Sequence, residues 1–316
     1  MMRLVLAGIA ILVAIDAGVA AEVAYYQLPG GTGPHDVAPA ANGTVWYTGQ
    51  RKGLLGRYDP KAANNVEIPL GPNAMPHGVV VGPDGAAWVT EGGQNAIARV
   101  DAQSHAVKLF PLPKEAPYAN LNTLTFDRRG TPWFTGQAGY YGRVTPASGK
   151  VEVWKAARGF GPYGITTTPS GDVWYASLAG DHIARIDLDS GAATLVEPPR
   201  KGVGPRRIWS DSKGLLWVSL WNSGEVARYD PAAQSWKTWQ LPGSTRGCYS
   251  VYVDDRDKVW LTDFAANAIV RFDPTTETFE SFPSSKKNAN VRQMLGRPGE
   301  AWGAESGTDR LVVVRD

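Results

Sequence analysis

Two histidines that share a local context are the residues of this sequence best suited to chemistry. His35 lies in the segment Pro-His-Asp-Val and His77 in the segment Pro-His-Gly-Val, and Glu91 follows His77 by 14 residues. Histidine titrates near neutral pH and is the commonest general base, while carboxylates bind hard cations such as Mg²⁺ through oxygen. If the fold brings these three side chains together, they could remove a proton beside a carbonyl group that a metal ion polarises.

The elements that must position these residues follow from an internal repeat. Seven tryptophans recur at spacings of 41 to 45 residues, and most of them follow a turn such as Asn42-Gly43 or Asp84-Gly85. Each repeat holds four short apolar or alternating segments separated by Gly, Asp, Asn and Pro, which is the pattern of strands and turns. Repeats of this length with four strands are typical of propeller blades, so the sequence predicts an all-β, seven-bladed β-propeller. The tryptophans are Trp46, Trp88, Trp133, Trp174, Trp217, Trp260 and Trp302.

A recurring arginine completes the repeat. It stands ten or eleven residues after the tryptophan in six of the seven units. Because both residues recur unchanged from blade to blade, we expect the tryptophan to pack between adjacent blades and the arginine to tie strands or blades together. The arginines are Arg57, Arg99, Arg143, Arg185, Arg228 and Arg271.

Strand counting predicts how the ring closes. A fourth strand follows the first three in each of the first six repeats, but the sequence ends at Asp316, just after the third segment of the seventh. The segment 24–29 is a further strand outside the repeats, and adding it to the last blade would remove an exposed sheet edge. We therefore expect residues 22–316 to form one domain in which the N-terminal strand completes the seventh blade.

Two sets of equivalent positions differ in residue type from repeat to repeat. In a propeller the inner strands line a central channel, and ligand sites gather around one end of it. The positions eleven residues before each tryptophan and three residues after it are mostly polar, and we expect them to surround this channel mouth. His35, Tyr163, Arg206 and Tyr249 are the predicted ligand contacts. The first set is His35, His77, Asn122, Tyr163, Arg206, Tyr249 and Val291, and the second is Gly49, Glu91, Gly136, Ser177, Leu220, Asp263 and Glu305.

Charge is expected to be divided around the mouth. A closed ring places the seventh repeat next to the first, so Glu305 and Asp263 could extend an acidic sector near the two histidines. Arg206, Arg207 and Arg292 could supply positive charge elsewhere around the channel.

The second repeat resembles the blades of a known family. Its segments Pro-His-Gly-Val, Asp-Gly-Ala-Ala-Trp-Val-Thr-Glu and Asn-Ala-Ile-Ala-Arg-Val-Asp, within residues 76–101, are similar to those of streptogramin B lyases, also called virginiamycin B lyases. The resemblance extends from about Pro34 to Val314. It implies a metal-dependent lyase that opens a cyclic depsipeptide by elimination across its ester bond. It further implies His77 as the catalytic base, His35 as a substrate contact and Glu91 as a Mg²⁺ ligand.

One departure from the family pattern leaves other functions open. The family's second metal-ligand glutamate corresponds here to Met75, a poor ligand for a hard cation. One alternative is a non-catalytic propeller that binds a peptide, a cell-wall fragment or a partner protein. Another is a calcium-dependent lactonase-like hydrolase, which would use Asn122, Asp263 and Glu305.

The N-terminal segment and the composition bound the location and the partners. Residues 1–21 carry an early arginine, an apolar run and a stretch of small residues, which is the pattern of a cleavable signal peptide. We therefore expect a periplasmic or secreted protein that is not inserted in a membrane after cleavage. A net charge of +2 gives no reason to expect binding to nucleic acid. We expect a monomer that binds a small molecule or cyclic peptide. Cys248 is interpreted as a buried apolar side chain, and His105 and His182 as outer-loop residues without a functional role.

Overall fold

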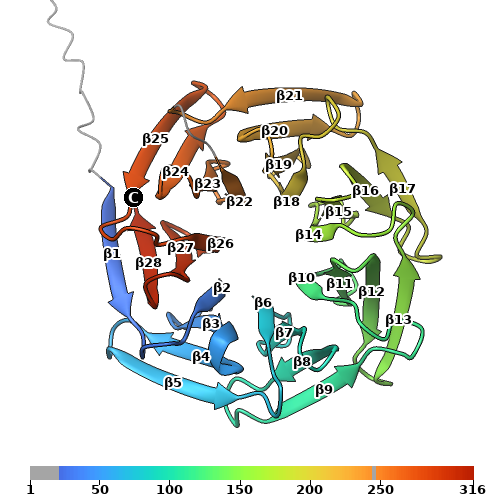
Figure 1. The fold of residues 1–316 in the computed structure, drawn as a ribbon, viewed down its shortest axis with the longest axis vertical. Coiled ribbons are helices and arrows are strands. Elements are labelled where there is room, and N and C mark those ends of the chain that lie inside the picture. Colours follow the sequence, from blue (N-terminus) through green and yellow to red (C-terminus); the bar gives the residue numbers. More distant parts are fainter. Residues whose placement is uncertain (1–20, 244–246) are drawn as a thin grey trace, which may run out of the picture.

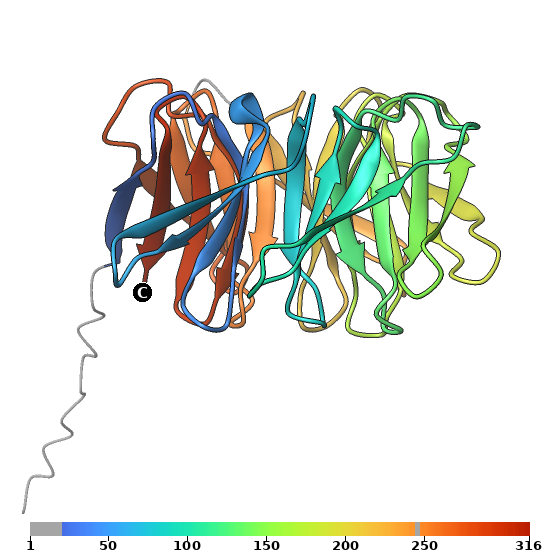
Figure 2. The same ribbon diagram turned by 90° about the horizontal axis from the view of Figure 1, so that it is seen from below.

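Seven four-stranded antiparallel sheets form a closed ring (Figure 1). The computed structural model describes residues 21–243 and 247–316, and within them the only helical element is the single 3₁₀ turn η1 (Gln50–Lys52). The strands run between two opposite faces of the ring, where the loops gather (Figure 2). This architecture confirms the prediction of an all-β, seven-bladed β-propeller.

The predicted signal peptide at residues 1–21 lies outside the described part of the chain, except for Ala21. Within the described part, no helix is long and apolar enough to span a membrane.

Each blade is a four-stranded meander whose first strand is the innermost (Figure 1). Blade 1 comprises β2 (Pro34–Pro39), β3 (Val45–Gly49), β4 (Leu54–Asp59) and β5 (Asn64–Pro69). Blade 2 comprises β6 (Pro76–Val81), β7 (Ala87–Glu91), β8 (Ala96–Val100) and β9 (Val107–Pro111). Blade 3 comprises β10 (Leu121–Phe126), β11 (Pro132–Gly136), β12 (Tyr140–Thr145) and β13 (Lys150–Lys155). Blade 4 comprises β14 (Pro162–Thr167), β15 (Val173–Ser177), β16 (His182–Ile186) and β17 (Ala193–Val196). Blade 5 comprises β18 (Pro205–Ser210), β19 (Leu216–Leu220), β20 (Glu225–Asp230) and β21 (Ser235–Gln240). Blade 6 comprises β22 (Cys248–Val253), β23 (Val259–Asp263), β24 (Ala268–Asp273) and β25 (Thr278–Pro283). Blade 7 comprises β26 (Val291–Arg297), β27 (Glu300–Glu305), β28 (Arg310–Arg315) and β1 (Glu22–Gln27).

The N-terminal strand β1 is the outer strand of blade 7, as predicted. It pairs antiparallel with β28 along its whole length. Tyr26 stacks on the blade tryptophan Trp302 with ring centroids 5.4 Å apart, and Leu28 just beyond the strand is buried. The two ends of the described chain therefore meet in one sheet, which closes the ring.

The recurring tryptophan and arginine have the structural roles expected of them. The ring centroid of Trp88 lies 5.5 Å from that of Phe110 in its own blade and 5.7 Å from that of Phe126 in blade 3. Arg57 donates a hydrogen bond of 2.7 Å to the carbonyl oxygen of Ala102 in the next blade. These contacts hold neighbouring blades together and need no ligand.

Each inner strand carries a β-bulge near the same end. In all seven blades two residues of the inner strand oppose one residue of the second strand. In blade 1 the bulge falls between Pro34 and Val37 and contains His35 and Asp36. Because a bulge re-aims side chains, the two bulge residues of each blade are placed to build the lining of the channel.

Candidate functional site

The first bulge residues of the seven inner strands form a connected ring, which we call the mouth ring. The ring centroids of His35 and His77 are 3.9 Å apart, and the hydroxyl oxygens of Tyr163 and Tyr249 are 3.0 Å apart. The structure therefore brings the four predicted ligand contacts and the predicted base into one set of side chains. The members are His35, His77, Asn122, Tyr163, Arg206, Tyr249 and Arg292.

The seventh member of this ring corrects the sequence analysis. Spacing from the tryptophan predicts Val291 at this position, but Val291 pairs with Glu305 just outside the bulge, and Arg292 is the first bulge residue. The β26–β27 hairpin is one residue shorter than the corresponding hairpin of blade 6, which shifts the equivalent position by one. The mouth ring therefore has a second arginine in place of a valine.

The second bulge residues form another layer, which we call the channel layer. Arg207 donates a hydrogen bond of 2.5 Å to Oγ1 of Thr123, and its Nη2 lies 3.4 Å from Oδ1 of Asp36, so these contacts join three blades. A Cβ atom at Gly78 would lie 2.6 Å from the carbonyl oxygen of Asn122, so this position accepts only glycine without a shift. The members are Asp36, Gly78, Thr123, Gly164, Arg207, Ser250 and Gln293.

The hydrogen bonds of His77 define its tautomer. Its Nδ1 lies 3.0 Å from the carbonyl oxygen of Asn122, and a carbonyl oxygen can only accept. Nδ1 therefore carries the proton, and Nε2 keeps the lone pair of a base. The side-chain amide of Asn122 donates to that Nε2 at 3.3 Å.

The second imidazole is held by a carboxylate. Nδ1 of His35 lies 2.7 Å from Oδ1 of Asp36, and the same oxygen faces Arg207. Burial raises the pKa of Asp36, while the guanidinium of Arg207 opposes that rise. This chain of contacts fixes the plane of the His35 ring against His77.

Both imidazoles are held neutral by their surroundings. Burial lowers the pKa of His35 well below 6.5, and the charges of Arg292, Arg207 and Arg206 lower it further. Burial also lowers the pKa of His77 well below 6.5, with a smaller contribution from His35. At neutral pH the mouth ring therefore holds two uncharged imidazoles, one with its Nε2 lone pair defined by hydrogen bonding.

Hydroxyl groups two residues after the blade tryptophans hold the bulges in place. Oγ1 of Thr48 accepts the backbone N–H of Asp36 at 3.0 Å and donates to the carbonyl oxygen of His77 at 2.8 Å. Thr90 donates in the same way to the carbonyl oxygen of Asn122 in blade 3, at 2.6 Å. These bonds run from blade to blade and set the positions of the mouth-ring backbone.

Arg206 lies within an aromatic cage on the far side of the ring from the histidines. Its guanidinium carbon is 3.9 Å from the ring centroid of Tyr249, 4.4 Å from that of Tyr163 and 4.7 Å from that of Trp221. It donates a hydrogen bond of 2.7 Å to the hydroxyl of Tyr163. Cation–π contacts of this kind stabilise a guanidinium and restrict its motion.

The two tyrosines of the mouth ring differ in acidity. Burial raises the pKa of Tyr163, and the adjacent Tyr249 raises it further. Burial would also raise the pKa of Tyr249, but the charges of Arg206, Arg207 and Arg292 outweigh it and lower that pKa to about 8. The Tyr249 hydroxyl is therefore the more acidic donor of the pair.

Glu91 is bound to a loop of its own blade. Its Oε1 accepts the backbone N–H of Met75 at 2.5 Å and that of Gly93 at 3.0 Å. Asp263 has the corresponding role in blade 6, where its Oδ1 accepts backbone N–H groups that include that of Gly247 at 3.1 Å. The carboxylate that accompanies the histidines is that of Asp36, which was not among the predicted site residues.

The donor set around Glu91 does not fit a resident Mg²⁺ ion. Mg²⁺ requires near-octahedral coordination by oxygen. Besides the Oε1 that accepts backbone N–H groups, Glu91 offers one further oxygen, Oε2, which is buried and has no partner among the described residues. Met75, at the position of the family's second ligand, offers only a thioether and is exposed. Magnesium binding stays a prediction of the resemblance.

His35, Asp36 and His77 form the group of potential metal ligands that the described residues contain, with ligand atoms within 4.8 Å of one another. The guanidinium of Arg207, 3.4 Å from Asp36, already supplies the positive charge that balances this carboxylate. The positive charge of Arg207 disfavours the binding of a metal ion at the same place. We interpret the three residues as a hydrogen-bonded acid–base cluster.

Other sequence predictions concern residues that the structure separates. Both carboxylate oxygens of Glu305 are used outside the channel, where Oε2 accepts from Arg310 and Oε1 from Ser284. Asn122 belongs to the mouth ring, whereas Asp263 caps a loop, so the lactonase-like set is not assembled. The acidic sector expected from Glu305 and Asp263 is likewise absent from the lining formed by the described bulge residues.

The prediction for the location of His182 is wrong, whereas the prediction that Cys248 is buried is confirmed. His182 was expected in an outer loop, but it begins β16 and is fully buried, with its pKa lowered by that burial. Its ring packs against Tyr175 within the blade, so the correction is one of location. Cys248 is fully buried, and burial raises the pKa of its thiol, as expected for an apolar side chain.

The sequence predicted Arg207 as a charge around the channel, but not Asp36 as its partner there. Asp36 and Arg207 immediately follow predicted mouth residues, and strict alternation along a strand would point them away from the channel. The bulge, present in every blade, removes that alternation. Recognising one bulge in the repeat would have identified the whole second layer.

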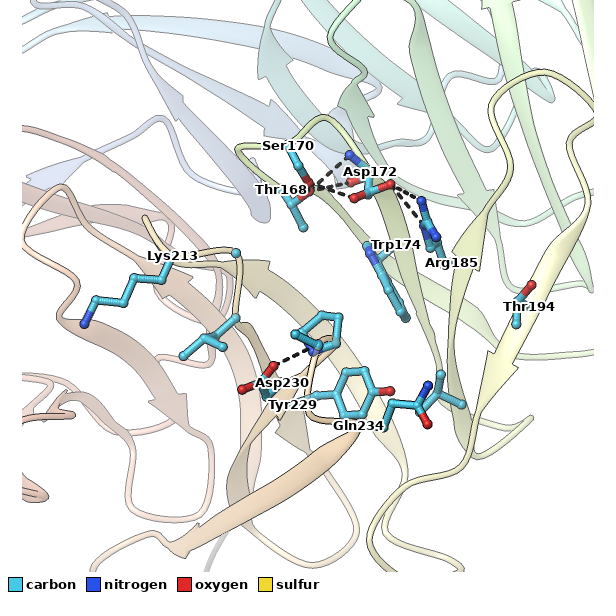
Figure 3. A pocket seen from close by; sticks show the side chains of 15 residues that line it. Thr168, Ser170, Asp172, Trp174, Arg185, Thr194, Lys213, Tyr229, Asp230 and Gln234 are labelled. Carbon is cyan, nitrogen blue, oxygen red and sulfur yellow. Dashed lines mark hydrogen bonds and ion pairs between the residues drawn. The ribbon is translucent and has the colours of Figure 1, made fainter.

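A separate cleft lies at the opposite end of blades 4 and 5 (Figure 3). It has a volume of about 420 Å³ and is lined by Trp174, Tyr229 and the ion pair of Asp172 with Arg185. A smaller cleft of about 330 Å³ occupies the corresponding place between blades 5 and 6, where Trp217 lines it. Because the cleft recurs with the repeat, it is a consequence of blade packing, and we assign it no function.

Comparison with known proteins supports the family resemblance. The sequence matches the profile of the virginiamycin B lyase family over residues 64–316. A search of curated proteins gave no match. Among solved structures, virginiamycin B lyase from Staphylococcus aureus is 22% identical, with a TM-score of 0.86, over 94% of this chain and 99% of that one. A catalytically inactive His-to-Ala variant of that enzyme has been solved with quinupristin.

More distant structural neighbours share the ring architecture. YCF48, solved with a bound D1 peptide, is 15% identical with a TM-score of 0.73, over 93% of this chain and 97% of that one. The extracellular domain of a hybrid two-component system from B. thetaiotaomicron is 14% identical with a TM-score of 0.69, over 92% of this chain and 40% of that one. At these identities the likeness concerns the fold alone.

Proposed function

The chain belongs to the virginiamycin B lyase family, and from that premise we propose that it is a carbon–oxygen lyase that opens a cyclic ester or depsipeptide at its mouth ring. The observation that carries the proposal is the tautomer of His77. Its Nδ1 donates to the Asn122 carbonyl oxygen at 3.0 Å, so its Nε2 is an acceptor, and burial lowers its pKa so that the imidazole is a neutral base. A general base has to be unprotonated, and the C–H group of the substrate would take the place of the Asn122 side-chain amide, which donates to Nε2 at 3.3 Å.

The proposed reaction is a β-elimination. Nε2 of His77 removes the proton on the carbon beside a carbonyl group, the C–H electron pair forms a carbon–carbon double bond, and the bond from the neighbouring carbon to the ester oxygen breaks. The ester leaves as a carboxylate, so no water is consumed. His35, packed 3.9 Å from His77 and anchored by Asp36, positions the substrate and the base.

The proposal is tested by turnover of a streptogramin B followed by mass spectrometry. An elimination product keeps the mass of the substrate, whereas a hydrolysis product gains one water. We expect His77→Ala to lower turnover by about 10²- to 10⁴-fold, the range for loss of a positioned base. The matched control is His105→Ala, which replaces a histidine in the turn between β8 and β9. Turnover by His77→Ala equal to that of the control would contradict the assignment of the base.

A second candidate is a non-catalytic propeller that binds a peptide or small molecule at the same mouth. Met75, exposed in place of a family metal ligand, favours this candidate. The neighbour YCF48, which shares the ring architecture, has been solved with a bound peptide. Calorimetric binding of a cyclic depsipeptide, without any product after prolonged incubation, would favour this function over the lyase.

We also propose that the protein acts outside the cytoplasm. The support is the signal-peptide pattern of residues 1–21 and the extracellular location of one structural neighbour. Cell fractionation with an antibody against the mature chain, together with N-terminal sequencing, tests this. A full-length protein recovered from the cytoplasm would contradict it.

A further inference from the structure

We propose that the substrate carries a carboxylate on the carbon that loses the proton, and that Arg206 and Arg292 bind this carboxylate. The inference rests on the elimination and on the base of the proposed function, but it replaces the neutral depsipeptide by a substrate whose α-carbon carries a free carboxylate. The ligand is a β-alkoxy or β-acyloxy carboxylate, in which the acid group neighbours the C–H bond and the leaving oxygen stands one carbon further away.

The charges of the two layers support an anionic ligand. Their bulge residues include three guanidinium groups, those of Arg206, Arg207 and Arg292, and one carboxylate, that of Asp36. Arg207 is paired with Asp36, but neither Arg206 nor Arg292 forms an ion pair with any described residue. Two arginines packed among aromatic rings without a counter-ion are an anion site, because a partly buried charge is stabilised by an opposite charge.

The donors of these arginines are only partly used. Arg206 donates one hydrogen bond, to Tyr163, and its buried Nε has no partner in the described part of the chain. Arg292 donates from Nε to Oγ of Ser306 at 3.0 Å and from Nη1 to the Tyr249 hydroxyl at 3.4 Å. A guanidinium has five N–H donors in a planar fork that matches the two oxygens of a carboxylate. Both arginines therefore keep N–H groups available for an acid.

The fold places these two arginines on either side of Tyr249, because both guanidinium groups contact its ring. Arg292 is the first bulge residue of blade 7, next to the blade of His35, and its charge acts on that imidazole. Arg206 contacts Tyr163, whose ring centroid is 6.2 Å from that of His77. A carboxylate held between the two guanidinium groups would therefore lie at Tyr249 and face the imidazole pair across the mouth ring. The aromatic cage keeps Arg206 in this position before any ligand arrives.

Removal of a proton next to a carboxylate explains why guanidinium groups are needed at this site. Removing a proton next to a carboxylate creates a second negative charge on the acid, and this dianion is the main barrier to the reaction. Fixed guanidinium groups neutralise that developing charge, which is the electrostatic stabilisation that a metal ion supplies in other lyases. The residues around Glu91 do not form a Mg²⁺ site. The arginines thus supply the electrostatic stabilisation that a metal ion would otherwise supply.

The atoms of the step balance without any co-reactant. The proton moves from the α-carbon to Nε2 of His77, the C–H electron pair becomes the double bond, and the leaving oxygen takes the pair of the broken C–O bond. An acyloxy group leaves as a carboxylate. An alkoxy group also takes a proton from Tyr249, whose hydroxyl lies 3.0 Å from that of Tyr163. The imidazolium then returns its proton to the tyrosine through solvent.

The test separates ligand binding from turnover. Affinities are measured by calorimetry in the His77→Ala background with two acidic probes, trigalacturonate as the β-alkoxy acid and a peptide ending in O-acetylthreonine as the β-acyloxy acid. Their methyl esters are the neutral controls. We expect at least one acid to bind tenfold or more tightly than its ester. Equal affinities of acid and ester for both probes, or binding of neither acid, would overturn the carboxylate site.

Arginine variants in the same background locate the site. Arg206→Gln and Arg292→Gln should each weaken binding of the acid at least tenfold and leave binding of the ester unchanged. Arg185→Gln, at the opposite end of blade 4, is the matched control, and melting temperatures verify folding. Arg206→Lys keeps the charge but loses the fork, so it should restore only part of the affinity. If Arg206→Gln and Arg292→Gln, both folded, bind the acid as tightly as the control, the inference is wrong.

Turnover by the unmodified protein then tests the function separately. The near-ultraviolet absorbance of an α,β-unsaturated acid reports the double bond. Tight binding of the acid without this absorbance would overturn the lyase and keep the carboxylate site. Elimination of neutral esters as fast as acids would keep the lyase and overturn the carboxylate site.

Discussion

Acidification should destabilise this protein through the two imidazoles of the mouth ring. Burial lowers the pKa of both His35 and His77 well below 6.5. As the pH falls below about 6.5, the unfolded chain takes up protons on both histidines while the folded protein does not. The free energy of unfolding therefore decreases with falling pH until the folded-state pKa values are reached.

The size of this effect follows from linkage. Between about pH 7 and about pH 5.5, a histidine that titrates normally when unfolded and stays neutral when folded costs about 1.2 kcal/mol of stability. Both together cost about 2.4 kcal/mol, a large part of the stability of an ordinary domain. Asp36 acts in the opposite sense, because burial raises its pKa and the folded protein takes up its proton first as the pH falls.

Urea denaturation followed by tryptophan fluorescence at the two pH values measures the difference. We expect the double variant His35→Gln, His77→Gln to lose about 2 kcal/mol less stability on acidification than the unmodified protein, because Asp36 remains in both. His105→Gln is the control for replacing any histidine. A double variant whose stability falls as steeply as that of the unmodified protein would refute the assignment of neutral, buried imidazoles.

Three further changes test other parts of the structure. Deleting residues 22–30 should lower the melting temperature sharply, because it exposes the edge of β28 and opens the ring; an unchanged melting temperature in calorimetry would reject this closure. Trp88→Ala should destabilise the protein by about 3 to 5 kcal/mol, the usual effect of truncating a large buried aromatic, and urea denaturation measures it. A variant that keeps its stability but loses ligand binding would show that Trp88 has another role. Treatment with EDTA should leave ligand binding and turnover unchanged, because Glu91 retains one free oxygen; a loss that MgCl₂ reverses would establish the metal that the resemblance implies.

The blade architecture could be predicted because it is encoded locally and repeated. Seven tryptophans with similar spacing, strand-length apolar segments and turn dipeptides each describe one blade, and one blade predicts the others. The role of β1 followed from a strand missing in one repeat and present as an extra segment elsewhere. Such arguments use only the pairing requirement of strands, so they need no three-dimensional information beyond the repeat.

The candidate site could be predicted only in part, because spacing is a poor guide where hairpins differ in length. The mouth positions of six blades were found by counting back from the tryptophan, and His35 and His77 are indeed in contact. In blade 7 the shorter hairpin replaces Val291 with Arg292. Glu91 stands in the expected strand position, yet nearby loop N–H groups bind its carboxylate. A spacing rule cannot anticipate this competition between backbone and ligand.

By itself the sequence determined the ring of seven blades, its closure and the presence of two equivalent histidines, because strands, turns and repeats are properties of short segments. Only the tertiary structure decided what surrounds those histidines. Asp36 meets Arg207 across 171 residues of sequence, and Arg206 is placed in its cage by residues of three blades. Charge and pKa depend on distances through space, and in a closed ring those distances are set by all the blades together.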